Sequence, residues 1–257
     1  MLTLEQIRQY FPEEIAKRNP RGLMVEYLQY ELLDSLFSLK EAVHLSFIGG
    51  TAIRMLLQNP RFSEDLDFDN FGLSFDDFEK ALQKTCRALE VKGFLVEYRM
   101  VERGAYHCYV RFPKILYESR LSADVREKIL IRVDTELKQK IYEPQRFLLN
   151  KFTIYRQVLT APLAILLSQK MMAVMQRKRE KGRDLFDVSM LLGLTQPDFK
   201  YMQQHLGIEK KDIIDQFTKR VEEIDLKYLA GDVEPFLFDP RQKERLLTFR
   251  EFWQQHC

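Results

Sequence analysis

Residues 47–69 read FIGGTAIRMLLQNPRFSEDLDFD, and this stretch decides the fold. The apolar run that ends at Ile48 predicts a strand, and Gly49-Gly50-Thr51 predicts a tight turn. The apolar residues that follow have helical spacing, which predicts a short helix over residues 51–58 that ends before Asn59-Pro60. The beginning of the stretch therefore predicts a strand, a glycine turn and a helix in direct succession.

Three aspartates close the stretch. Asp65, Asp67 and Asp69 alternate with Leu66 and Phe68. Alternation with a period of two is typical of a strand, so we expect the carboxylates on one face and the apolar side chains on the other. Like charges this close are costly unless a positive partner lies among them, and a hard divalent cation is the natural one. A solvated strand face is the alternative interpretation.

Composition excludes several classes of protein. With 257 residues, 46% of them hydrophobic and 30% charged, the chain can bury a substantial core in one large or two smaller domains. Its formal net charge is only +2, so the molecule as a whole is not a polyanion binder. Any contact with nucleic acid must therefore come from a local basic patch.

The cysteines and the N-terminus predict a cytoplasmic protein. Cys86, Cys108 and Cys257 have neither the spacing of a disulfide framework nor that of a zinc site, which fits a reducing compartment. The first residues, MLTLEQIRQYFPEE, carry charges throughout and do not resemble a signal peptide. No segment approaches the roughly 18–20 apolar residues that a membrane span needs, so we expect no membrane association.

The chain as a whole is predicted to be α/β (α+β), with a mixed sheet before a helical lobe. Apolar periodicity predicts helices over residues 23–39 and 75–89 and, with an interruption near Pro12, over residues 1–18. It predicts strands over residues 45–48, 64–69, 95–101, 106–112 and 130–133. Ser74 with Asp77 predicts a helix cap, and Arg103-Gly104 predicts a hairpin turn. From about residue 145 the pattern is helical, with helices over residues 163–175, 183–192 and 208–229. The predicted domains are 1–145 and 146–257.

The carboxylates fit the chemistry of phosphoryl transfer. Two divalent ions can clamp the attacking and leaving oxygens, and Mg²⁺ needs only one or two carboxylates for each ion. Asp65 and Asp67 would form the pair, and Asp134, which ends a strand of the same sheet, is the best third ligand. The Gly49-Gly50 turn could bring backbone N–H groups close to a triphosphate, and Thr51 adds a hydroxyl.

The Gly-Gly-Thr and Asp-x-Asp motifs together resemble the signature of a known family. Gly49-Gly50-Thr51 followed by Asp65-Leu66-Asp67 resembles the signature of the polymerase-β-type nucleotidyltransferase superfamily. The fuller string GGTAIR…RFSEDLDFD is similar to one branch, the AbiEii/AbiGii-type toxins, which include the MenT toxins. That branch also has a downstream Lys and an Arg-Asp-x-x-Asp element on helices. The corresponding residues here are Lys170, Ala173, Arg177 and Arg183-Asp184-Leu185-Phe186-Asp187.

The resemblance implies a fold and an activity. The fold would be a polymerase-β-type nucleotidyltransferase core with a mixed sheet, plus a helical C-terminal lobe. The activity would be transfer of a nucleoside monophosphate (NMP) from an NTP, with Mg²⁺ or Mn²⁺ and with release of pyrophosphate. The acceptor would be RNA, notably the 3′ end of tRNA, with blocked translation as the result, and a cognate antitoxin would restrain the toxin. The alternatives are a protein or small-molecule acceptor, or a non-catalytic module that binds a nucleotide or a partner.

The resemblance also implies roles for individual residues. Asp65 and Asp67 would hold the metal ions, Asp134 would hold the second ion or activate the acceptor hydroxyl, and Asp69 would support the site. In the helical lobe, Lys170 would neutralise charge on the leaving pyrophosphate. The remaining predicted residues are Asp187 or Asp184, to hold Lys170 or contact the nucleotide, and Arg54 and Arg61, to contact phosphate or frame the site.

Two further features leave alternatives open. The basic run at residues 177–183 could contact RNA phosphates, or it could be a solvated helix end. Tyr98, Tyr106 and Tyr109 could stack on bases, although core packing is the simpler interpretation. His107, beside Cys108, is predicted to be ordinary strand content rather than a metal ligand.

Overall fold

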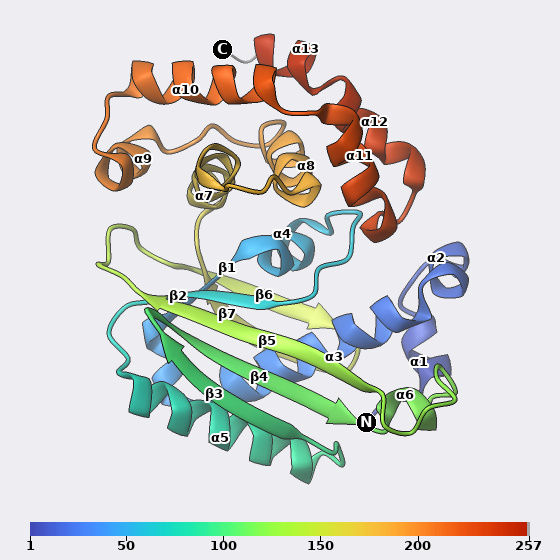
Figure 1. Cartoon of the computed structure of the whole chain (residues 1–257). Coiled ribbons are helices and arrows are strands. Elements are labelled where there is room, and N and C mark those ends of the chain that lie inside the picture. The colour runs from blue at the N-terminus through green and yellow to red at the C-terminus, as the bar shows by residue number, and fades with distance from the viewer. Residues whose placement is uncertain (256–257) are drawn as a thin grey trace. The chain divides into compact units, whose positions relative to one another are not determined.

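The structure is a computed structural model that describes residues 1–255 (Figure 1). It divides into two compact units. The first comprises Met1–Ala52, Ser63–Lys140 and Pro144–Thr160, and the second comprises Ile53–Phe62, Ile141–Glu143 and the chain from Ala161 onward. The first unit contains the sheet, and the second is helical.

A mixed sheet forms the first unit. Its strands are β1 (Leu45–Ile48), β2 (Leu66–Asn70), β3 (Glu97–Arg103), β4 (Ala105–Pro113), β5 (Lys128–Leu137), β6 (Gln145–Lys151) and β7 (Ile154–Thr160). Their order across the sheet is β3-β4-β5-β2-β1-β7-β6. The pairs β2/β5 and β1/β7 are parallel, and the other neighbours are antiparallel. The mixed sheet predicted from the sequence is confirmed.

Two long helices, α3 (Pro20–Leu36) and α5 (Phe75–Val91), cover one face of this sheet (Figure 1). Leu66 and Phe68 point to that side and are 1% and 2% exposed, and the Phe68 ring packs against Phe37 and Phe47. Because side chains alternate along a strand, the aspartates of β2 lie on the opposite face. The predicted cap is also present, since Ser74 Oγ accepts a hydrogen bond of 3.1 Å from the backbone N–H of Asp77.

The first unit is completed by short helices. They are α1 (Leu4–Arg8), α2 (Glu13–Arg18), the 3₁₀ turn η1 (Lys40–His44) and α6 (Ile115–Glu118). The helical segment predicted over residues 1–18 is interrupted at Pro12, as expected, and forms the two helices α1 and α2. Helix α4 (Gly49–Leu57) begins in the first unit and continues into the second.

Helices make up the rest of the second unit. They are α7 (Leu163–Gln176), α8 (Gly182–Leu191), α9 (Phe199–Leu206), α10 (Lys210–Glu223), α11 (Leu226–Val233), η2 (Glu234–Phe236), η3 (Pro240–Lys243), α12 (Glu244–Leu247) and α13 (Phe249–Gln254). The core of this unit includes Phe186, Phe217, Phe249 and Trp253, and the Trp253 ring packs edge-on against Phe217.

Two predictions of secondary structure were wrong. Residues 145–160 form strands β6 and β7 rather than helix, so the sheet continues to Thr160 and the compact units do not divide at residue 145. β-branched residues such as Ile154 and Val158 favour strand there, and Phe152 at φ 58° makes the tight connection. The single helix over residues 208–229 is two helices, because Asp225 caps α11.

The structure describes two of the three cysteines and allows a search for membrane-spanning helices within residues 1–255. Cys86 and Cys108 are buried and free, while Cys257 lies outside the described residues. Within residues 1–255, no helix combines the length and the apolar character that crossing a membrane requires.

Candidate functional site

A row of side chains crosses the sheet on the face opposite α3 and α5. The strand register pairs Ile48 with Asp67, Asp67 with Asp134, and Asp134 with His107. Neighbouring strands are roughly 4.8 Å apart, so Asp67 and Asp134 lie side by side on parallel strands. We call Asp67, Asp134 and His107 the carboxylate row. Its two aspartates, predicted from widely separated parts of the sequence, are thus brought together.

His107 is a member of this row that the sequence did not reveal. Its Nδ1 lies 2.9 Å from Asp134 Oδ1, and both side chains are partly exposed. A hydrogen bond at this distance fixes the orientation of the carboxylate. The antiparallel register of β4 and β5 creates the contact, and the sequence carries only the strand pattern, not the register.

Gly49 places the backbone directly against Asp67. Its φ is 77°, a left-handed conformation that glycine adopts without strain. A Cβ atom at this position would overlap Asp67 Oδ2. The first residue of the Gly-Gly turn is therefore required for two reasons: the turn conformation and the close approach of the chain to a carboxylate of the row.

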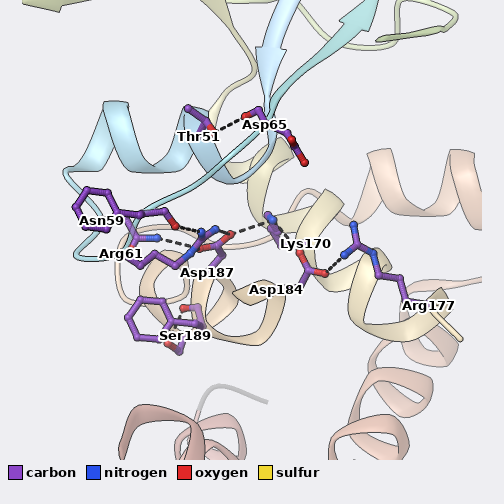
Figure 2. A network of polar contacts seen from close by, with 11 residues as sticks. Thr51, Asn59, Arg61, Asp65, Lys170, Arg177, Asp184, Asp187 and Ser189 are labelled. Atoms are coloured by element: carbon purple, nitrogen blue, oxygen red, sulfur yellow. Dashed lines mark hydrogen bonds and ion pairs between the residues drawn. The ribbon is translucent and has the colours of Figure 1, made fainter. Parts of the chain in front are cut away.

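Thr51 and Asp69 have structural contacts. The Thr51 hydroxyl is buried and donates to the backbone carbonyl of Asp65, which ties the start of α4 to the segment before β2 (Figure 2). A contact of this hydroxyl with a triphosphate would have to replace that bond. Asp69 is 1% exposed, and Lys138 Nζ lies 3.3 Å from its Oδ1, which fits a supporting role.

Arg132 on β5 supplies positive charge among the carboxylates. Its Nη2 donates to Asp65 Oδ2 at 2.5 Å and lies 3.8 Å from Asp134 Oδ2. The hydrogen bond to Asp65 raises the pKa of Arg132 above its ordinary value, with smaller contributions from Asp134 and Asp67. Within residues 1–255, no three His, Cys, Asp or Glu side chains are arranged as a set of metal ligands. Asp65 is turned toward Arg132 instead.

The second unit contains a buried network of charges around Asp187. Arg61 donates to Asp187 through Nε at 2.7 Å and Nη2 at 2.6 Å, and Asn59 Nδ2 donates at 2.9 Å (Figure 2). The side chains of Arg61 and Asp187 are 2% and 0% exposed. Although burial opposes ionisation, Arg61 and then Lys170 hold the pKa of Asp187 below its ordinary value.

Lys170 on α7 joins this network to Asp184. Its Nζ lies 2.8 Å from Asp184 Oδ1 and 2.9 Å from Asp187 Oδ2. Burial would lower the pKa of Lys170, but the two carboxylates raise it, so the amine is charged at neutral pH. Arg177 contacts Asp184 at 2.6 Å from the other side. Both aspartates of α8 therefore point toward Lys170, a choice that the sequence had left open.

The two predicted phosphate-binding arginines are buried in the second unit. Arg61 is saturated by Asp187 and by the carbonyl of Phe62, to which its Nη1 donates at 2.9 Å. Arg54 donates to the carbonyl of Asn59 at 3.0 Å, and its guanidinium lies 4.5 Å from the centre of the Phe238 ring. This geometry fits framing of a site from within rather than direct contact with phosphate.

The basic run at residues 177–183 has internal partners. Besides the contact of Arg177 with Asp184, Arg183 lies 4.2 Å from the centre of the Phe236 ring, and Glu180 pairs with Arg220 at 2.8 Å. The run is therefore in part a structural element of the helical unit.

Over residues 31–255 the sequence matches a protein family described as nucleotidyl transferase AbiEii toxin, type IV TA system. The chain belongs to the AbiEii family. The resemblance seen in the sequence is thereby confirmed, and the protein is a nucleotidyltransferase toxin of a type IV toxin–antitoxin system. Membership implies an NTP substrate and an antitoxin partner. No curated protein sequence matches this AbiEii chain.

Solved structures confirm the fold. MenT4, a nucleotidyltransferase toxin from Mycobacterium tuberculosis H37Rv, is similar with a TM-score of 0.63 and 14% identity, over 99% of this chain and 90% of that chain. JHP933 from Helicobacter pylori has a TM-score of 0.58 and 18% identity, over 92% and 91%. A putative nucleotidyltransferase from H. pylori has a TM-score of 0.59 and 19% identity, over 92% and 94%.

The position of Gly49 leads to a testable expectation for the AbiEii protein. We expect Gly49→Ala, whose Cβ would displace Asp67, to slow pyrophosphate release from NTP by about 100-fold, because a shift of about 1 Å within a reacting site can cost that much. The matched control is Gly104→Ala, at φ 71° with no atom within 4 Å of the added Cβ. It carries the same strain of about 1–2 kcal/mol in unfolding free energy but should keep the wild-type rate. Equal rates for Gly49→Ala and wild type would show that the contact with Asp67 has no function.

Proposed function

We propose that this AbiEii protein uses a divalent metal ion, Mg²⁺ or Mn²⁺, to transfer an NMP from an NTP to the 3′ end of tRNA or a related RNA, and thereby blocks translation. The observation that supports this most strongly is the strand register that makes Asp67 and Asp134 neighbours. A 3′ end that carries an extra nucleotide no longer accepts an amino acid in the normal position, which accounts for a toxic effect.

The carboxylate row fits the metal. Mg²⁺ needs only one or two carboxylate ligands and fills its other positions with phosphate and water oxygens. Asp67 and Asp134 provide two partly exposed carboxylates, and the Arg132 guanidinium already lies within 3.8 Å of the row. A bound divalent ion would neutralise charge on the phosphate oxygens. Asp65 would be the third ligand once it is no longer paired with Arg132.

Further residues of the first unit have proposed roles in the transfer. Asp134, oriented by His107, accepts the proton of the acceptor hydroxyl. The backbone N–H groups of Gly49 and Gly50, at the start of α4, bind the triphosphate. Thr51 is a further candidate for nucleotide contact, at the cost of its bond to Asp65.

The residues of the second unit keep their proposed catalytic roles. Lys170 would neutralise the charge that develops on the pyrophosphate, and Asp184 and Asp187 would hold its amine. Arg61 and Arg54 would frame this group rather than bind phosphate themselves.

Arg132 should compete with the metal. Replacing it by Gln removes a unit charge that lies near 4 Å from Asp134, an interaction worth on the order of 1–4 kcal/mol. Arg132→Gln should therefore tighten Mn²⁺ binding by at least about tenfold, measured by calorimetric titration without nucleotide. The control is Arg126→Gln, an exposed arginine that pairs with Asp124, and it should leave Mn²⁺ affinity unchanged. Equal affinities for wild type and Arg132→Gln would contradict the proposed metal position.

The nature of the acceptor is tested by giving the protein RNA, protein and small-molecule acceptors in one reaction. The protein is incubated with each of the four α-labelled NTPs and Mg²⁺, in the presence of total tRNA, a protein extract and small metabolites, and the label is then separated by class. We expect label in RNA. Label in protein or in small metabolites, with unlabelled RNA, would replace the proposed acceptor by the alternative.

A further inference from the structure

At its β3–β5 end, the sheet carries arginine and tyrosine side chains on the face opposite the helices. On β4, the side chains of Cys108, Val110 and Phe112 are buried, and Tyr106 packs on Phe75 of α5 with ring centres 5.3 Å apart. Because Phe75 belongs to α5, these side chains lie on the side of the sheet that the helices cover, and Figure 1 shows α5 on that side. The alternate residues of β4 therefore lie on the other face, which is the face of the carboxylate row.

A second row of side chains lies on that face, beside the carboxylate row. The register pairs Arg99 of β3 with Tyr109 of β4, and Tyr109 with Arg132 of β5. Two residues along a strand correspond to roughly 7 Å, so this row runs parallel to the carboxylate row at that spacing. We call Arg99, Tyr109 and Arg132 the arginine row. Arg111 is two residues further along β4, on the same face.

The arginine row is accessible and positively charged. Arg99 is exposed, and Tyr109 and Arg111 are partly exposed. Within residues 1–255, neither Arg99 nor Arg111 has an ion-pair partner. Glu97, the nearest acidic side chain on this face of β3, is neutralised by Lys128 at 2.7 Å. An aromatic ring between guanidinium groups is the arrangement that binds single-stranded nucleic acid by stacking and phosphate contact.

The order of strands separates the arginine row from the Gly49-Gly50 turn, which is the proposed binding site of the triphosphate. Across the sheet the order is β3-β4-β5-β2-β1, with the carboxylates on β5 and β2. Gly49 follows β1, on one side of the carboxylates, whereas Arg99 and Tyr109 lie on β3 and β4, on the other side. An NTP at the glycine turn and an acceptor on the arginine row would thus approach the carboxylates from opposite sides, as a transfer between two substrates requires.

We propose that the arginine row, with Arg111, binds the single-stranded 3′ end of the RNA acceptor. This inference rests on the proposed function and specifies its acceptor subsite. Tyr109 stacks on a base, Arg99 and Arg111 contact phosphates, and the terminal hydroxyl lies at Asp134, one row away. Phosphate contacts and stacking are tolerant of sequence, so this subsite selects a single-stranded end rather than a particular RNA.

Binding and transfer are measured separately to test the subsite. A fluorescent single-stranded RNA with the terminal sequence of tRNA is titrated by anisotropy with the full-length protein, without NTP. Tyr109→Ala should weaken binding by about tenfold or more, and Tyr109→Phe should restore it, because stacking is worth about 1–3 kcal/mol per base. Arg99→Gln should also weaken binding and lower the salt dependence by about one charge. The control is Arg87→Gln, an exposed arginine on α5 at the other face, which should bind like wild type.

The two proposals can fail separately. If wild type transfers NMP to tRNA while Tyr109→Ala and Arg99→Gln bind and use RNA like wild type, the subsite is wrong and the function stands. If wild type neither binds RNA nor labels it, both are wrong. If Tyr109→Ala dissociates a homodimer in light scattering without changing RNA affinity, the face is an interface between copies of the chain, and the subsite is likewise overturned.

Discussion

Asp67→Asn should reduce nucleotidyl transfer by at least about 10³-fold, because several kcal/mol of charge stabilisation by the metal depend on this carboxylate. Asp67 connects two parts of the proposed site in the first unit: it pairs in register with Asp134 and lies against Gly49. Asparagine keeps the shape of the side chain and removes its charge. The loss should therefore appear in the rate and not in the fold.

The Asp67→Asn experiment has a matched control on the same unit. Asp76→Asn changes an exposed aspartate at the start of α5 in the same way and should keep the wild-type rate. The rates are measured as pyrophosphate release, and urea unfolding verifies that both variants fold. A folded Asp67→Asn protein that releases pyrophosphate as fast as wild type would refute the assignment of the carboxylate row.

Asp187→Ala should have the largest effect on stability. Removing Asp187 deprives the buried guanidinium of Arg61 of its two hydrogen bonds to that carboxylate and takes one of two carboxylates from Lys170. Removal of one partner from a buried ion pair costs about 3–5 kcal/mol, so we expect this loss in the unfolding free energy by urea titration. Asp215→Ala, an exposed aspartate on α10, should change it by less than about 0.5 kcal/mol.

A double variant separates burial of an unpaired charge from simple loss of volume. Arg61→Met combined with Asp187→Leu removes both members of the pair and should regain a large part of the stability, because apolar replacement of a buried pair is often neutral. If the double variant is as unstable as the sum of the single ones, the buried pair is not the cause of the lost stability.

The lowered pKa of Asp187 adds a pH dependence to the stability. The contribution of Asp187 to the unfolding free energy is present at neutral pH and is lost as the pH falls through that pKa.

The period of a strand made the carboxylate site predictable from the sequence. Alternation alone places Asp65 and Asp67 on one face, and the strand that contains Asp134 is the neighbour of β2 in the sheet. The helical spacing of Asp184 and Asp187 likewise placed both near one helix face but left open which of them reaches Lys170, and the structure shows that both do. Local periodicity was sufficient to place residues of one element on a common face, whereas Asp134 was chosen by its position at a strand end and Lys170 by the family resemblance.

Contacts set by register or by distant parts of the chain were not predictable. His107 and Arg132 reach the carboxylates only through the alignment of β4 and β5, which no local pattern encodes. Asn59 and Arg61 follow the glycine motif closely in sequence, yet they contact Asp187, well over a hundred residues away. Strands β6 and β7 were missed because their short apolar patterns suit helix and strand equally.

The most direct test of the proposed function is to find which molecule, and which end of it, receives the α-label of an NTP. The wild-type protein is incubated with α-labelled NTPs and Mg²⁺, once with intact tRNA and once with tRNA whose 3′-terminal diol has been oxidised by periodate. We expect label in the intact tRNA, at its 3′ end, and none in the oxidised tRNA, because the acceptor hydroxyl is then absent. Equal labelling of both RNAs, or label in the protein while intact tRNA stays unlabelled, would contradict transfer to the 3′ end.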